Sequence, residues 1–161
     1  MQVLLTAFKN TSSEILVKSI KTYDRLVLEN DKIRSVKQLE EKTQKENYRY
    51  IFSFGQRPLI KNKLHIESSA EISGEVLETE FNAEKLKKAF EDCGAAVMLS
   101  HYAGTSYCNN IYFYGMKMIA ERCSNAEMIF IHIPYMKNIS NYAEFFKSME
   151  NGINNFLSEE Q

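Results

Sequence analysis

The sequence lacks several features that would narrow its class at once. It has no tryptophan, only two prolines and three cysteines among 161 residues. Cys93, Cys108 and Cys123 are an odd number without close spacing, which argues against a disulfide framework or a zinc site. Free thiols suit a reducing cytosol, so we expect a cytoplasmic protein without a metal or other cofactor. One of the three thiols could be a nucleophile.

Net charge and long apolar runs are also scarce. The formal net charge is -1, so nothing favours nucleic acid or an anionic membrane as a partner. The sequence has no apolar run of about 18 residues, so no transmembrane helix is predicted. Its first residues, MQVLLT, lack the basic flank and longer apolar core of a signal peptide. We expect them to open a β-strand instead.

What is present is the balance of an ordinary globular protein. Hydrophobic residues make up 44% of the chain and charged residues 25%. The length suits one domain, which we place over residues 1–161. A chain of this length can bury a core without disulfides or metals.

Apolar periodicity predicts strands that alternate with helices. We expect strands at 3–8, 25–28, 48–54, 64–66, 95–99 and 128–133, and helices at 11–23, 32–45, 82–93, 107–122 and from 141 onward. This alternation predicts an α/β fold, a three-layer α/β/α sandwich with a mostly parallel central sheet. Sites in such folds lie at the carboxyl ends of strands, which directs attention to the loops after Phe54, Leu99 and Ile133.

Cys108 is the strongest nucleophile candidate. It lies where the loop 103–107 passes into a predicted helix. A thiol at a helix N-terminus feels the positive end of the helix dipole and several unpaired N–H groups, which favour the nucleophilic thiolate. The same N–H groups could hold an oxyanion. The alternative is a buried structural cysteine, which is the commoner fate of this residue type.

His132 ends an apolar strand. A polar ring in such a run is either a satisfied core histidine or a catalytic base at a strand end. The two candidates support each other, because a thiol–imidazole pair needs both groups at neighbouring strand ends. Cys93 and Cys123 fit a structural role better, since they lie on an apolar helix stripe and at a helix C-terminus. The sequence pattern does not assign His65 to a site, and we expect His101 to lie in a loop.

Two motifs resemble those of a known family. Residues 103–115 read AGTSYCNNIYFYG, which resembles the nucleophile motif A-G-T-(F/Y)-(V/L)-C-N-x-(V/L)-x-Y-G of pyroglutamyl peptidase I. Residues 130–135 read FIHIPY, which resembles F-I-H-(I/V)-P-Y, the motif of the catalytic histidine. Cys108 and His132 lie 24 positions apart, the spacing typical of this family. Weaker similarity links residues 3–8 to the family's first strand and Gly55-Gln56 to the start of its G-Q-A-G-G-R segment.

The resemblance implies a shortened, divergent member with an α/β/α sandwich fold. It implies a homo-oligomeric thiol protease, dimer or tetramer, that removes an N-terminal pyroglutamyl residue from a peptide or small amide. By carry-over, Cys108 is the nucleophile and His132 the base and acid. The thiolate attacks the acyl carbonyl, and the imidazole protonates the leaving amine and then activates water.

The chain departs from the family pattern in two places. The first loop, G-F-x-P-F-G-G, becomes AFKNTS; Phe8 survives, and it and Gln56 are the expected substrate contacts. The third catalytic residue is a glutamate in E-R-V-A-I-N, which falls on Asn62 or Lys63. We expect Asn62 to orient His132, with Glu67 as the rival. Each of these two residues has an alternative reading as a solvated loop residue. The family's arginine in D-A-R-I becomes Glu71.

Three hypotheses follow. The first is an active cysteine exopeptidase specific for pyroglutamate or a related N-terminal acyl group, supported by the two intact motifs. The second is a thiol hydrolase with a changed substrate, supported by the altered first loop. The third is a catalytically impaired member that binds peptides or serves as an assembly subunit, supported by the missing glutamate and arginine.

Overall fold

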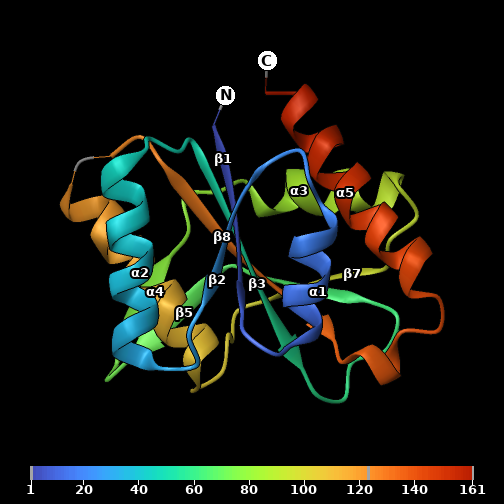
Figure 1. Cartoon of the computed structure of the whole chain (residues 1–161), viewed down its shortest axis with the longest axis horizontal. Coiled ribbons are helices and arrows are strands. Elements are labelled where there is room, and N and C mark those ends of the chain that lie inside the picture. Colours follow the sequence, from blue (N-terminus) through green and yellow to red (C-terminus); the bar gives the residue numbers. More distant parts are fainter. Residues whose placement is uncertain (1, 123, 161) are drawn as a thin grey trace.

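The computed structural model describes residues 2–122 and 124–160, so the prediction for Cys123 lies outside the described residues. A six-stranded sheet in the order β2-β1-β3-β8-β4-β7 lies between two layers of helices (Figure 1). Its strands are β1 (Val3–Phe8), β2 (Asp24–Leu28), β3 (Tyr50–Arg57), β4 (Leu64–Glu67), β7 (Val97–Ser100) and β8 (Glu127–Pro134). The helices are α1 (Ser12–Ser19), α2 (Lys32–Lys45), α3 (Ala83–Asp92), α4 (Tyr107–Glu121) and α5 (Tyr142–Ser158), with a short 3-10 helix, η1 (Met136–Asn138), before α5. The predicted α/β fold with a mostly parallel sheet is confirmed.

The direction of β7 differs from the prediction. β1, β2, β3 and β8 run parallel, whereas β4 pairs antiparallel with β8 and parallel with β7. The carboxyl end of β7 therefore does not lie at the same edge as those of β3 and β8, and that part of the prediction is wrong. The cause is the connection after β3, which passes the end of β8 before β4 begins and so reverses the chain. The loop 101–106 then leads back to α4.

The predicted helix starts are confirmed by side-chain caps. Thr11, Asp31, Asn82 and Asn141 each accept a hydrogen bond from a backbone N–H in the first turn of their helix. The end of α1 is not as predicted, because the helix stops at Ser19 and Ile20 is already extended. The side chain of Ile20 is fully buried, so the chain turns there to place it in the core.

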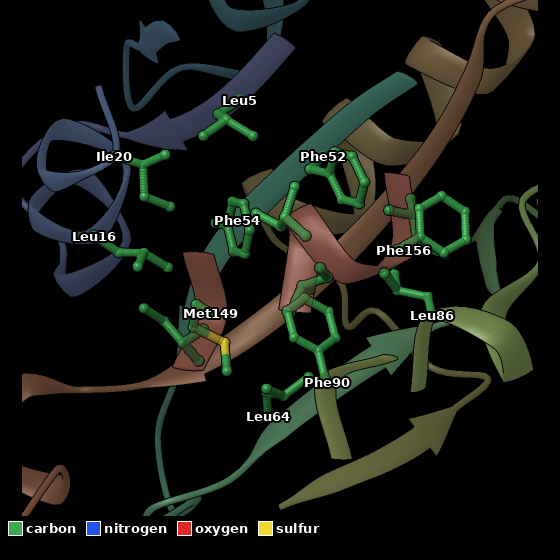
Figure 2. Close-up of a cluster of buried hydrophobic side chains, with 14 of the residues drawn as sticks. Leu5, Leu16, Ile20, Phe52, Phe54, Leu64, Leu86, Phe90, Met149 and Phe156 are labelled. Atoms are coloured by element: carbon green, nitrogen blue, oxygen red, sulfur yellow. The ribbon is translucent and has the colours of Figure 1, made fainter. Parts of the chain in front are cut away.

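Successive residues of each strand face opposite helix layers. Leu5, Phe52 and Phe54 point into the larger cluster, where α1, α3 and α5 contribute side chains such as Leu16, Phe90 and Phe156 (Figure 2). Leu4, Ile51 and Phe130 point to the opposite face, where they pack with Phe113 and Cys108 of α4. Cys108 therefore lies on the face that α2 and α4 cover (Figure 1).

The structure contains a two-stranded hairpin that the sequence pattern does not predict. β5 (Ser69–Ile72) and β6 (Glu75–Glu78) are joined by Ser73 and Gly74, which both have positive φ. Positive φ at both central positions is the requirement of the type I′ hairpin turn. Asn109 of α4 holds the hairpin, because its side chain donates to the carbonyl of Glu71 and accepts from the N–H of the same residue.

Within residues 2–122 and 124–160, no helix has the length and apolar character needed to cross a membrane. In the same residues, no group of three or more histidine, cysteine or acidic side chains could hold a metal ion.

Candidate active site

Cys108 lies in the first turn of α4, directly above a glycine of the sheet. Its Sγ would be 2.5 Å from a Cβ added at Gly55, so no side chain fits between α4 and β3 here. Gly55 is not among the residues with positive φ. The position therefore needs glycine for space and not for backbone conformation. Ser106 is the N-cap of α4 and its side chain makes no cap hydrogen bond, which leaves the first N–H groups of the helix open.

His132 lies on the neighbouring strand at the same level. It pairs in register with Gly55, and residues paired across parallel strands face the same side of the sheet. Phe130, two residues earlier on β8, also packs against Gly55 and lies 5.0 Å from the His132 ring between ring centroids. The fold thus places the thiol and the imidazole over adjacent strand positions on one face.

Glu67 contacts the imidazole. Its Oε1 lies 2.8 Å from Nδ1 of His132, and its side chain is fully buried. A carboxylate can only accept here, so the ring proton lies on Nδ1 and Nε2 is free to act as a base. Glu67 reaches the ring because β4 pairs antiparallel with β8, which sets Glu67 beside Phe130.

Asn62 is held elsewhere. Its Nδ2 donates to Oγ of Ser140 at 2.9 Å, and its Oδ1 accepts from the N–H of Ser140 at 2.7 Å. Its backbone has a φ of 50°, which asparagine tolerates well. Of the two residues expected to orient His132, the structure brings Glu67 to the ring and places Asn62 in a loop that anchors the segment before α5.

Arg57 also contacts Glu67 and is not among the site residues predicted from the sequence. Its Nη1 donates to Oε1 of Glu67 at 3.1 Å and to the carbonyl of Tyr102 at 3.3 Å. Its guanidinium also faces the Tyr102 ring, 6.0 Å from the centroid. The only signal in the sequence is a charged residue at the end of a buried strand, directly after the Gly55-Gln56 pair.

Burial controls the ionisation of Cys108. Burial, which is the largest cause, and the negative charge of Glu67 together raise the pKa of this thiol to about 12. The N–H of Cys108 itself, Ser106 and the charge of Arg57 lower this pKa, but by less. The helix terminus therefore lowers the pKa of Cys108 as expected, but burial raises it by more, so the resting group is a thiol. A base must remove its proton during any reaction.

His65 is a second histidine next to His132 and is partly buried. The two residues are directly paired across β4 and β8. Both ring nitrogens of His65 are buried and have no hydrogen-bond partner in the part of the chain that the structure describes. Burial lowers the pKa of His65, and the positive charge of Arg57 lowers it further, so this ring is neutral near pH 7.

The two expected substrate contacts have structural partners. Phe8 is buried and its ring lies 6.0 Å from that of Tyr107, the residue before Cys108. Gln56 accepts a hydrogen bond from the N–H of Ser12 at 3.0 Å and so holds the loop between β1 and α1. Phe8 forms part of the wall beside the nucleophile, whereas Gln56 supports the loop that replaces the family's first motif.

Comparison with solved structures shows the same fold in pyrrolidone carboxyl peptidases. The enzyme from Thermococcus litoralis superposes with a TM-score of 0.81 at 18% identity, covering 98% of this chain and 93% of that one. A mutant enzyme from Pyrococcus furiosus gives 0.84 at 18% identity over 100% of both chains. Pyroglutamyl peptidase I from Bacillus amyloliquefaciens gives 0.84 at 18% identity over 94% of both chains.

Sequence comparison identifies the family directly. A search of curated protein sequences found no match to this chain. The sequence model of pyroglutamyl peptidase, however, matches residues 62–149. That match covers more than half of the chain and includes Glu67, Cys108 and His132. The resemblance noted from the two motifs is thereby confirmed, and this chain belongs to the pyroglutamyl peptidase family.

Proposed function

We propose that this chain is a cysteine peptidase that removes an N-terminal pyroglutamyl group from a peptide or small amide. The observation that carries the proposal is the hydrogen bond between buried Glu67 and Nδ1 of His132, beside the glycine on which the Cys108 thiol rests. A nucleophile, a base and a carboxylate that orients the base form the arrangement used for acyl transfer. The similar solved structures described above are named pyrrolidone carboxyl peptidase or pyroglutamyl peptidase I.

In the proposed mechanism, His132 takes the thiol proton on Nε2 while sulfur attacks the acyl carbonyl. The open N–H groups at the start of α4 are donors for the developing oxyanion. The imidazolium then gives its proton to the leaving amine, and a thioester remains on Cys108. Water, deprotonated by the same ring, attacks the thioester and releases the free acid and the thiol.

The burial of the three groups determines how this reaction begins. Cys108 is 8% exposed, His132 4% and Glu67 0%. Because the thiol is neutral at rest, the charged pair of thiolate and imidazolium forms only as the substrate is attacked. Exclusion of water strengthens the interaction of Glu67 with the imidazolium at that moment.

A related acyl group is the second candidate for the substrate. The support is in the first loop, where the family's glycines and second phenylalanine are absent and Gln56 is engaged with Ser12. In this version Cys108 and His132 keep the same roles, and only the group in the acyl pocket changes. In either version we propose a cytoplasmic protein, consistent with free thiols at Cys93 and Cys108, that assembles as a homo-oligomer.

The test is hydrolysis of a pyroglutamyl fluorogenic amide by the purified chain. Cys108→Ser and His132→Ala are expected to abolish turnover. Cys93→Ser is the matched control, because Cys93 is a free cysteine at the C-cap of α3, on the layer that covers the other face of the sheet. A parallel panel of other N-acyl amides separates the two substrate candidates. Absence of Cys108-dependent turnover on the whole panel would reject the proposed function.

A further inference from the structure

Two cationic or potentially cationic groups share one oxygen of Glu67. Oε1 accepts from Nδ1 of His132 at 2.8 Å and from Nη1 of Arg57 at 3.1 Å. The other oxygen, Oε2, is buried and has no hydrogen-bond partner among residues 2–122 and 124–160. Glu67 is fully buried, whereas the side chain of Arg57 is 28% exposed. All of the polar contact that Glu67 makes through its carboxylate is therefore divided between the ring and the guanidinium.

We propose that Arg57 is a positioning residue of the active site, which sets how strongly Glu67 stabilises the protonated His132 ring by holding the same carboxylate oxygen. This inference rests on the proposed function in giving His132 and Glu67 their catalytic roles. Arg57 acts through Glu67 and does not itself touch the reacting atoms.

Position and charge both support this role. Arg57 is the last residue of β3, and the Nη1 that donates to Glu67 also donates to the Tyr102 carbonyl, while the guanidinium faces the Tyr102 ring. These contacts with Tyr102 limit the movement of the guanidinium away from Glu67. A buried carboxylate without a cation beside it is strongly disfavoured in its charged form, and Arg57 supplies that cation.

The other ionisable groups around Glu67 do not supply a positive charge beside its carboxylate. His65, on the same strand, has a lowered pKa because of burial and is neutral. Cys108, on α4, has a raised pKa and is also neutral. Tyr112, on α4, donates its hydroxyl to the backbone carbonyl of Glu67, and burial raises its pKa. The ammonium group of Lys63, the residue before β4, donates to Sδ of Met98 at 3.4 Å.

The charge of Arg57 has two opposite effects on the catalytic pair. It offsets the negative charge of Glu67, which weakens the stabilisation of an imidazolium at His132. It also lowers the pKa of Cys108, against the effect of Glu67. Removal of this charge is therefore expected to strengthen the attraction between Glu67 and a protonated His132 ring and to make the thiol harder to ionise.

The experiment measures kcat/KM for the pyroglutamyl amide as a function of pH in the wild type, Arg57→Met and Arg57→Lys. The acid limb of the profile is expected to move to higher pH by about one unit in Arg57→Met, because a charge within about 6 Å is lost. Arg57→Lys keeps the charge and is expected to stay within about 0.3 units of the wild type. Arg25→Met, an exposed arginine of β2, is the matched control and is expected to show no change.

A second readout does not depend on turnover. The rate of alkylation of Cys108 by iodoacetamide, followed by peptide mass spectrometry, is expected to fall about 3- to 10-fold at about pH 9 in Arg57→Met. If the wild type hydrolyses no amide, the proposed function fails and the alkylation rates still decide the role of Arg57. If Arg57→Met does not fold, Arg57→Gln replaces it. An unchanged acid limb and an unchanged alkylation rate in a folded variant would overturn the inference, as would loss of the wild-type profile in Arg57→Lys.

Discussion

Substitution of Gly55 by alanine gives the sharpest structural test of where the nucleophile lies. The new Cβ would be 2.5 Å from Sγ of Cys108, 2.8 Å from Cζ of Phe130 and 3.0 Å from Cε1 of the same ring. Ordinary contacts between such atoms are about 3.5 to 4.0 Å, so the thiol is expected to move by roughly 1 Å. Phe130 is fully buried and cannot move aside freely.

The expected consequences are separate for stability and for activity. Overpacking of this size lowers the free energy of unfolding by about 1–3 kcal/mol, measured by denaturant titration. Displacement of the nucleophile by about 1 Å lowers kcat/KM by roughly 100-fold, measured with the pyroglutamyl amide on protein shown to be folded.

Gly115→Ala is the matched control for this substitution. Gly115 also lies in the contact between α4 and β8, but the added Cβ would meet the flexible side-chain ends of Met128 and Leu39. Alanine in a helix interior gains about 1 kcal/mol of helix propensity, which offsets the crowding. We expect activity within about twofold of the wild type. Wild-type kcat/KM in folded Gly55→Ala would refute the placement of Cys108 as the nucleophile above Gly55.

Three further predictions concern ionisable groups of the site. Glu67→Gln is expected to lower kcat by about 10²- to 10⁴-fold with little change in KM, because the imidazolium loses its carboxylate, whereas Glu71→Gln on the hairpin leaves both constants unchanged. The alkylation rate of Cys108 is expected to rise roughly tenfold per pH unit between about pH 8 and 10, since burial raises its pKa to about 12; a plateau already reached at neutral pH would contradict this. The pKa of His65 is lowered in the folded chain, so the unfolded chain takes up a proton at this residue near pH 6.5 and the folded chain does not. The free energy of unfolding is therefore higher above that pH and falls below it. Urea titrations measure the free energy of unfolding at about pH 6.5 and pH 5. We expect this free energy to fall less over that range in His65→Asn than in the wild type, and an equal fall in both would contradict a neutral His65 ring in the folded chain.

The order of strands and helices could be predicted from the sequence because it is a local property. Apolar periodicity and N-cap residues such as Thr11, Asp31, Asn82 and Asn141 fixed where most elements begin. The β5–β6 hairpin was missed although Ser73 and Gly74 are turn residues between short apolar segments. Four-residue strands carry too little alternation to be recognised by period alone.

The contacts around His132 could not be predicted in the same way. Glu67 contacts the His132 ring because β4 is antiparallel to β8. Arg57 contacts Glu67 because β3 runs parallel to β8 and ends beside the end of β8. These pairings join segments distant in the sequence, and no local pattern encodes them. The motif alignment favoured Asn62 for the same reason, since position along the chain does not show that this side chain pairs with Ser140. The sequence identified the nucleophile and base candidates and left their surroundings to the fold.

The central claim is that Cys108 carries the acyl group during hydrolysis. The direct measurement is acid quenching during turnover of an activated pyroglutamyl ester, followed by peptide mapping of the trapped thioester. The account predicts one pyroglutamyl group on Cys108 in the wild type and none in Cys108→Ser. Turnover without an adduct at Cys108, or an adduct confined to Cys93, would contradict it.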